Sequence, residues 1–209
     1  EIGVRLVGSE MCIRDRPRPE WSGIAGGCSH PHANPQRDGM HTIERQAEQL
    51  AMAGVEVKTD FDRNWLNADI RHFKLAKRYV LLVPGGAPHR PFKRWPHYRS
   101  LATRLVKRGI TPVILGTWAE RDVIDDIFGA CPEAVDLSDK TSLMEIAGLS
   151  RKAVAAIGND TGPMHLIATT GCRSIVLYSS ASNPTLCAQR GPHVQILYLI
   201  HIRRSRRID

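Results

Sequence analysis

Short apolar runs alternate with amphipathic segments along the second half of the chain. Runs of four or five apolar residues followed by Gly, Ser or Thr are typical of buried strands in a parallel sheet. The segments between them place apolar residues three or four positions apart, as a helix does when one face packs on a core. The predicted strands are 79–83, 111–115, 134–137, 153–157, 174–178 and 194–197, and the predicted helices are 97–108, 120–128, 142–149 and 163–168. This alternation predicts an α/β fold over residues 78–197, with a Rossmann-like doubly wound parallel sheet and right-handed crossovers.

The pattern is weaker before residue 78. Residues 17–34 are rich in Pro, Gly, Ser and His, which favours an irregular loop, and residues 55–77 have the mixed composition of a linker. Residues 40–54 predict an amphipathic helix with Thr42 as a possible N-cap, and its apolar stripe is Ile43, Ala47, Leu50 and Ala51. Residues 17–77 are therefore predicted to be the end of a preceding domain and a linker.

The two ends of the chain do not fit the pattern. Residues 1–16 show neither strand alternation nor a helical stripe, and they resemble a translated sequencing-adapter artefact, as residues 198–209 do less clearly. We expect both ends to be non-native. The alternative for the tail is a basic arm for nucleic acid or anionic lipid, although no aromatic platform or recognition helix accompanies its arginines, Arg203, Arg204, Arg206 and Arg207.

Composition narrows the class of protein without choosing a function. The chain has 209 residues and 42% hydrophobic content, which is enough for a packed core. It has no run of 18 apolar residues and no apolar segment near the N-terminus, so we expect no membrane span and a cytoplasmic location. The formal net charge of +8 suits a nucleic acid, an anionic membrane surface or a phosphorylated substrate equally.

Cysteine and histidine positions do not predict a metal or disulfide framework. The five cysteines are scattered, odd in number and without CxxC spacing. Cys28, His30 and His32 invite a zinc interpretation, but a fourth ligand at useful spacing is not evident. We therefore expect no metal and no cofactor. A loop near an anionic acceptor is the other interpretation of this histidine-rich stretch.

The most informative stretch is the junction after the predicted strand 153–157. Residues 158–162, Gly-Asn-Asp-Thr-Gly, lead directly into a helical segment, with Asp160 or Thr161 as a possible N-cap and Pro163 suited to the first turn. Unpaired amides and the positive end of a helix dipole attract anions, so a phosphate is the expected ligand. The alternative is that Asp160 only caps a core helix.

Similar loops follow other predicted strands, and one edge of a parallel sheet brings such loops together. Ligands of open α/β sheets bind outside the carboxyl ends of the strands. A single glycine-containing loop would mean little, since glycine is common in such turns. Here several occur in register, at Pro84–Gly86, Gly116–Thr117, Ser138–Thr141 and Ser179–Ser180.

Two of these loops resemble a known family. Gly-Asn-Asp-Thr-Gly-Pro-Met-His at 158–165 resembles the signature of glycosyltransferase family 9, the bacterial heptosyltransferases of the lipopolysaccharide core. The segment 84–96, PGGAPHRPFKRWP, resembles the family's small-residue loop followed by Lys-x-Trp-Pro. The family has the GT-B architecture of two Rossmann-like halves, with the donor in the C-terminal half. The resemblance covers residues 17–197 and lacks the glycine-rich start of the N-terminal half, so it implies a truncated chain with most of the donor domain.

The resemblance implies roles for individual residues of the helix junction. Asp160 would contact sugar hydroxyls, while the amides of Thr161 and Gly162 would hold the donor diphosphate. His165 lies one turn into the helix and would have a supporting role, because a helix histidine among apolar residues is usually a packing group.

The glycine loops would complete this nucleotide-sugar site. The amides of Gly85 and Gly86 would approach the diphosphate, and Lys93 would pair with it and offset charge on the leaving ADP. The alternative for Lys93 is a solvated loop lysine. Glu120, which follows Gly116, would bind the adenosine ribose or, equally, would be a favourable acid in the first turn of its helix.

The resemblance further implies an inverting, metal-independent transfer of heptose from ADP-heptose to a lipid-linked saccharide. The acidic base of the family lies in the N-terminal half, so the catalytic residue is unknown here and the isolated chain is expected to be inactive. The resemblance also implies a monomer with possible peripheral contact with the inner membrane and without a nucleic-acid partner. A dehydrogenase is disfavoured because the sequence after Gly85-Gly86 is not GxGxxG, and a non-enzymatic basic binding module is favoured only if the terminal arginines are genuine.

Overall fold

The computed structural model describes residues 20–58, 62–86, 91–180 and 182–199. The chain divides into two compact units, residues 1–60 and 61–209. The predicted non-native ends, residues 1–16 and 198–209, lie outside the described residues, except for residues 198 and 199, which belong to the second unit. The arginines of the proposed basic arm also lie outside the described residues.

The first unit is small and built around one helix. Its described elements are β1 (Ser22–Gly23), β2 (His30–Pro31), the short 3₁₀ helix η1 (Arg37–Gly39) and α2 (Thr42–Met52). The helix predicted over 40–54 is thus present, but its N-cap is His41, whose side chain accepts a hydrogen bond from the Ile43 amide. Thr42 is the first helical residue instead. None of the α2 residues is fully buried, and Ile43 is 44% exposed.

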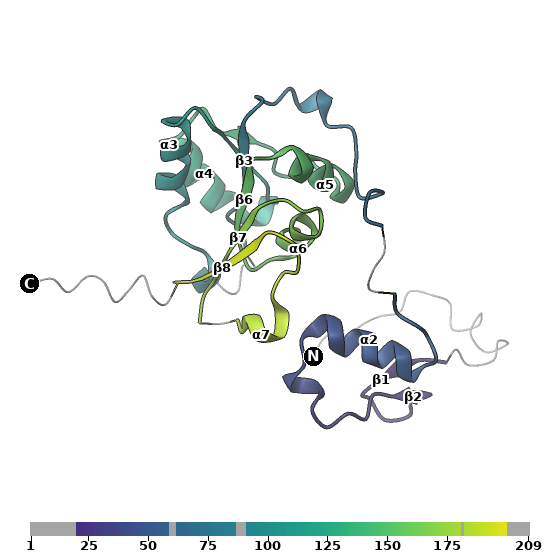
Figure 1. The fold of residues 1–209 in the computed structure, drawn as a ribbon. Coiled ribbons are helices and arrows are strands. Elements are labelled where there is room, and N and C mark those ends of the chain that lie inside the picture. Colours follow the sequence, from purple (N-terminus) through teal and green to yellow (C-terminus); the bar gives the residue numbers. More distant parts are fainter. Residues whose placement is uncertain (1–19, 59–61, 87–90, 181, 200–209) are drawn as a thin grey trace, which may run out of the picture. The chain divides into compact units, whose positions relative to one another are not determined.

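The second unit is the predicted doubly wound α/β fold (Figure 1). Six strands, all parallel, are arranged in the order β5-β4-β3-β6-β7-β8. The strands are β3 (Tyr79–Val83), β4 (Thr111–Ile114), β5 (Val135–Asp136), β6 (Ala155–Asn159), β7 (Ser174–Tyr178) and β8 (Val194–Tyr198). The helices are η2 (Arg71–Phe73), η3 (Pro91–Lys93), α3 (Tyr98–Val106), η4 (Trp118–Glu120), α4 (Arg121–Ala130), α5 (Leu143–Lys152), α6 (Gly162–Thr169) and α7 (Pro184–Cys187).

Alternate residues of the strands face two separate layers of helices. On β3, Leu81 packs with α5 and α6 side chains such as Leu149 and Ile167, whereas Leu82 packs with α3 and α4 side chains such as Leu105 and Ile124. Figure 1 shows these two helix pairs on opposite sides of the strands. Because both faces are covered, the central strands are apolar throughout, which explains why the sequence showed runs rather than alternation.

Two boundaries differ from the sequence prediction. The second unit begins at residue 61 rather than 78, because Ile70 is buried in its core and Phe73 packs beside it. Strand β6 begins at residue 155 and ends at Asn159, since Gly158 pairs with Val83 of the neighbouring strand. The predicted five-residue loop is therefore shorter, and only residues 160 and 161 separate β6 from α6. No described helix is long and apolar enough to cross a bilayer.

Candidate functional site

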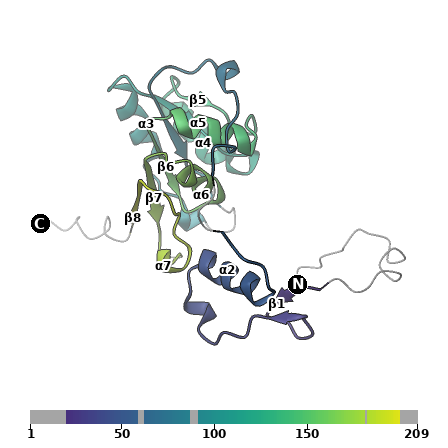
Figure 2. The same cartoon turned by 45° about the vertical axis from the view of Figure 1, so that its right-hand side comes forward.

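The predicted loops meet where the strand order reverses. From β3 the chain adds β4 and β5 on one side and β6, β7 and β8 on the other, so β3 and β6 flank the switch point. Doubly wound sheets bind ligands in the crevice beyond the carboxyl ends of such a strand pair. The loop after β3 and the β6–α6 junction lie at this place, and α7 lies beyond the same edge of the sheet in both ribbon views (Figures 1 and 2).

Asn159, the last residue of β6, joins the two loops. Its side chain is fully buried and donates hydrogen bonds to the carbonyls of Pro84 and Gly85, at 2.7 and 2.9 Å. Its Oδ1 accepts hydrogen bonds from the Trp95 amide and the Tyr98 hydroxyl, both at 3.2 Å. In the sequence, Asn159 stands out only as a member of the motif. The structure makes it the residue that holds the loop after β3 against the end of β6.

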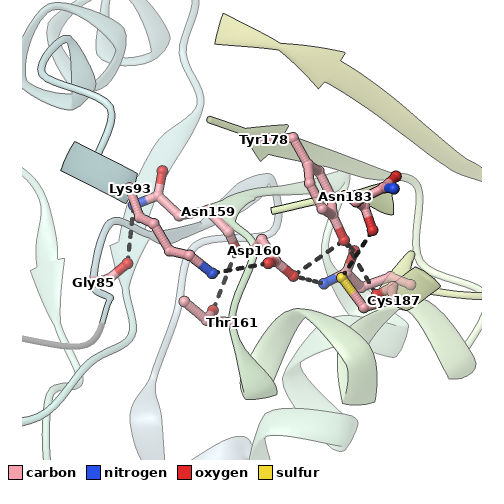
Figure 3. Close-up of polar contacts among 9 residues, drawn as sticks. Gly85, Lys93, Asn159, Asp160, Thr161, Tyr178, Asn183 and Cys187 are labelled. Atoms are coloured by element: carbon pink, nitrogen blue, oxygen red, sulfur yellow. Dashed lines mark hydrogen bonds and ion pairs between the residues drawn. The ribbon is translucent and has the colours of Figure 1, made fainter. Parts of the chain in front are cut away.

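Asp160 follows directly and accepts hydrogen bonds from side chains of distant segments (Figure 3). Lys93 Nζ lies 3.2 Å from its Oδ2, while the Tyr178 hydroxyl and Gln189 Nε2 donate to its Oδ1 at 3.1 and 3.0 Å. The N-cap position of α6 is Thr161, and no side-chain hydrogen bond caps this helix. The interpretation of Asp160 as a simple helix cap is therefore wrong, because its carboxylate is used in this network instead.

The surroundings of Asp160 keep its carboxylate ionised. Burial alone raises the pKa of Asp160, but hydrogen bonds from Ser182, Gln189 and Lys93 outweigh it and hold the pKa below the ordinary value. Burial and the neighbouring Asp160 carboxylate raise the pKa of Tyr178, so its hydroxyl keeps its proton and remains a donor. The Asp160 carboxylate is thus ionised at neutral pH and faces the Lys93 side chain.

Lys93 is not a solvated loop lysine. Its side chain is 14% exposed and that of Asp160 is 11% exposed, so the ion pair is largely shielded from water. The adjacent Arg94 points elsewhere: it donates to Asp122 at 2.9 Å and to the carbonyl of Gly86 at 3.2 Å. Lys93 and Asp160, which lie 67 positions apart in sequence, therefore come together as an ion pair at the switch point.

The start of α6 leaves room for a ligand. Thr161 is extended and its hydroxyl donates to the Asn159 carbonyl at 3.3 Å. Gly162 is exposed, and a Cβ added there would meet no atom within 4 Å. Pro163 occupies the first turn as predicted, and His165 is half-buried on the same helix. A helix N-terminus with open space beside its first residue can approach a phosphate closely.

Glu120 lies between the loops after β3 and β4. It forms a capping box with Thr117, accepting from its amide at 2.8 Å, and also accepts from the Gly86 amide at 3.0 Å. A Cβ on Gly85 would overlap the Glu120 carboxylate, and one on Gly116 would lie 3.1 Å from it. The first-turn role of Glu120 is therefore present, and its contact with a ribose stays a prediction.

The predicted residues form two groups at one edge, and three further residues were missed. Lys93, Asp160 and Thr161 form one group, and Gly85, Gly86, Gly116 and Glu120 form the other. Asn159 could have been suspected because it precedes Asp160 in the motif. In the sequence, Tyr178 is only the last residue of a predicted strand and Gln189 lies in an irregular stretch, so neither was predicted to belong to the site. Among the described residues, no group of three or more His, Cys, Asp or Glu side chains is arranged to hold a metal ion.

Residues 30–206 match the family model of glycosyltransferase family 9, the heptosyltransferases. The chain belongs to this family. Over 115 residues it is 34% identical to lipooligosaccharide heptosyltransferase 2 of Haemophilus influenzae, a match that covers 52% of this chain and 33% of that protein. This family 9 chain therefore matches only about a third of the length of that relative.

Solved structures of family 9 enzymes share the fold. The structure of Escherichia coli ADP-heptose lps heptosyltransferase II superimposes with a TM-score of 0.71 at 20% identity, covering 86% of this chain and 62% of that one. The E. coli heptosyltransferase WaaC with ADP gives a TM-score of 0.58 at 23% identity, covering 77% of this chain and 51% of that one. These likenesses identify the fold of this family 9 chain as that of GT-B heptosyltransferases.

Proposed function

We propose that the second unit binds an ADP-sugar, with ADP-heptose as the donor, at the switch point between β3 and β6. The observation that carries the proposal is the shielded Lys93–Asp160 ion pair beside the open N-terminus of α6. An ammonium group and a helix N-terminus together favour a diphosphate. The ADP complex of the related WaaC enzyme supports this choice of nucleotide.

The contacts of Asp160 suggest how the donor enters. An ionised carboxylate has about four acceptor positions, and Lys93, Tyr178, Gln189 and Ser182 all donate to this one. A sugar hydroxyl therefore needs one of these partners to leave. Lys93 is the partner that a diphosphate attracts, so we infer that Lys93 transfers to the diphosphate and frees Oδ2 of Asp160 for a sugar hydroxyl.

The same residues would assist the transfer itself. When an acceptor hydroxyl attacks the anomeric carbon, the bond to ADP breaks and negative charge grows on the diphosphate. Lys93 and the amides at the start of α6 would stabilise that charge. We propose an inverting, metal-independent transfer of heptose to a lipid-linked saccharide, with the acceptor base outside this chain. On this proposal the protein acts as a monomer at the cytoplasmic face of the inner membrane, and the chain alone is inactive.

Titration calorimetry of the chain with ADP and with ADP-heptose tests the donor site. Lys93→Ala should weaken binding of both ligands by about 1.5–3 kcal/mol, the range for a hydrogen bond to a charged group. Lys140→Ala is the matched control, because Lys140 lies in a loop at the same edge but donates to the Asp136 carbonyl. A wild-type chain that binds neither ligand, or equal losses for the two variants, would overturn the proposal.

A further inference from the structure

The opposite edge of the sheet, where the strands begin, is strongly basic. Lysines and arginines lie shortly before four of the six parallel strands, and they form what we term the amino edge. They are Lys77 and Arg78 directly before β3, Lys107 and Arg108 in the turn before β4, Arg151 and Lys152 at the end of α5 before β6, and Arg173 directly before β7. His193 precedes β8. Glu133, before β5, is the acidic residue of this group. Outside the amino edge, acidic and basic residues over 62–199 nearly balance.

Backbone pairing places residues of the amino edge beside the start of the neighbouring strand. The carbonyl of Arg78 accepts from the Thr111 amide at 3.0 Å, that of Arg173 from the Ala156 amide at 2.8 Å, and that of His193 from the Ser174 amide at 2.9 Å. Adjacent strands lie about 4.8 Å apart, which is less than the screening length of about 8 Å at physiological salt. The positive charges along the amino edge therefore reinforce one another.

The lysines and arginines at this edge are not tied up in ion pairs within the described part of the chain. At the opposite, nucleotide-binding edge, Lys93 pairs with Asp160, and Arg94 and Arg121 pair with Asp122 and Asp136. By contrast, none of the seven amino-edge lysines and arginines forms an ion pair with a described carboxylate. Asp69, on the segment that passes beside α5, lies close enough to Lys152 to interact with its charge, but its ion pair, at 2.7 Å, is with Arg71.

A hollow and an exposed aromatic ring lie next to the basic residues of the amino edge. A hollow of about 340 Å³ opens at this edge, and Arg151, Thr170, Arg173 and His193 are among the residues that line it. Arg151 also donates to the carbonyls of Arg63 and Leu66, which places the segment containing Trp65 beside the amino edge. Trp65 is 62% exposed. Tryptophan beside clustered basic residues is typical of proteins that lie at a membrane interface.

We propose that the amino edge binds an anionic lipid bilayer, with headgroup phosphates against the arginines and Trp65 in the headgroup layer. Nucleic acid fits less well, because sequence-independent binding of single strands uses several aromatic rings on which successive bases stack, and Trp65 is a single one. The inference builds on the proposed membrane contact but is independent of the nucleotide site, which lies at the other edge of the sheet.

Sedimentation with phosphatidylcholine vesicles, with and without phosphatidylglycerol, tests the inference. Each Lys or Arg near an anionic surface raises the membrane affinity about fivefold. Lys152→Gln with Arg173→Gln should therefore lower the affinity for the anionic vesicles by roughly 25-fold. The control double, Arg99→Gln with Lys140→Gln, removes the same charge at exposed positions elsewhere and should bind almost as the wild type does. Both doubles keep Arg203–Arg207, so their difference isolates the amino edge. Trp65→Ala should weaken binding in high salt as well as in low salt.

Three outcomes would overturn the inference: no preference of the wild type for anionic vesicles, equal losses for the two doubles, or binding of polyuridylate that the edge double loses while vesicle binding stays. The midpoint of thermal unfolding, measured on every variant, reports whether the unit has folded. A chain that binds vesicles without binding ADP refutes the proposed donor site alone, and the reverse result refutes the membrane surface alone.

Discussion

Lys93 Nζ and Asp160 Oδ2 lie 3.2 Å apart, so the two residues predicted to contact different parts of the donor form an ion pair with each other. Residues in direct contact do not contribute independently to binding, and a double-mutant cycle measures their coupling. The effect of removing either residue therefore includes the release of the other. This relationship changes what substitution of Asp160 should do.

Asp160→Asn should separate the two ligands. The neutral amide no longer holds Lys93, which becomes available to the diphosphate, so ADP should bind as well as before or better. ADP-heptose should bind more weakly, because the variant lacks the ionised acceptor for sugar hydroxyls, and hydrogen bonds to charged groups are worth about 1.5–3 kcal/mol. Calorimetry with both ligands measures the difference. Equal losses for ADP and ADP-heptose would remove the sugar-contact role from Asp160.

Gly162→Ala tests the approach of the diphosphate to α6. A methyl group at this position meets open space in the folded chain, so the midpoint of thermal unfolding should change little. ADP affinity should fall, because the added carbon lies where the phosphate would approach the first helical amide. Gly158→Ala is the contrasting variant: its Cβ would lie 2.6 Å from Met164 Sδ and should cost about 1–3 kcal/mol of stability. Unchanged ADP affinity in Gly162→Ala would contradict the phosphate position.

Gly85→Ala should destabilise the unit by about 1–3 kcal/mol, because its Cβ would displace the Glu120 carboxylate from its hydrogen bonds with the Gly86 and Thr117 amides. In a Glu120→Ala background the same change should cost much less, since the overlapping group is gone. Urea unfolding of the two single variants and the double gives the coupling energy. Additive losses would show that Gly85 is required for another reason, such as its own backbone conformation.

Much of the second unit followed from local sequence. Apolar runs such as 79–83 and the helical stripes between them depend on neighbouring residues alone, and the structure confirms the strands, the helices and the parallel doubly wound sheet. The positions of the glycine-containing loops at one edge also followed, because parallel strands all end on the same side. The short helix α7 was missed, since four residues give no periodicity to detect.

The sequence by itself thus determined the α/β class, the edge that carries the candidate site and the motif that places Asp160 next to a helix start. Only the tertiary structure decided what surrounds Asp160 and Glu120. Tyr178 and Gln189 reach Asp160 because β7 lies beside β6 and the chain after α7 returns to the same edge, and the Gly86 amide meets Glu120 because β3 lies beside β4. Such contacts join residues 18 to 34 positions apart, and no local pattern encodes them, because they depend on which strands become neighbours when the sheet forms.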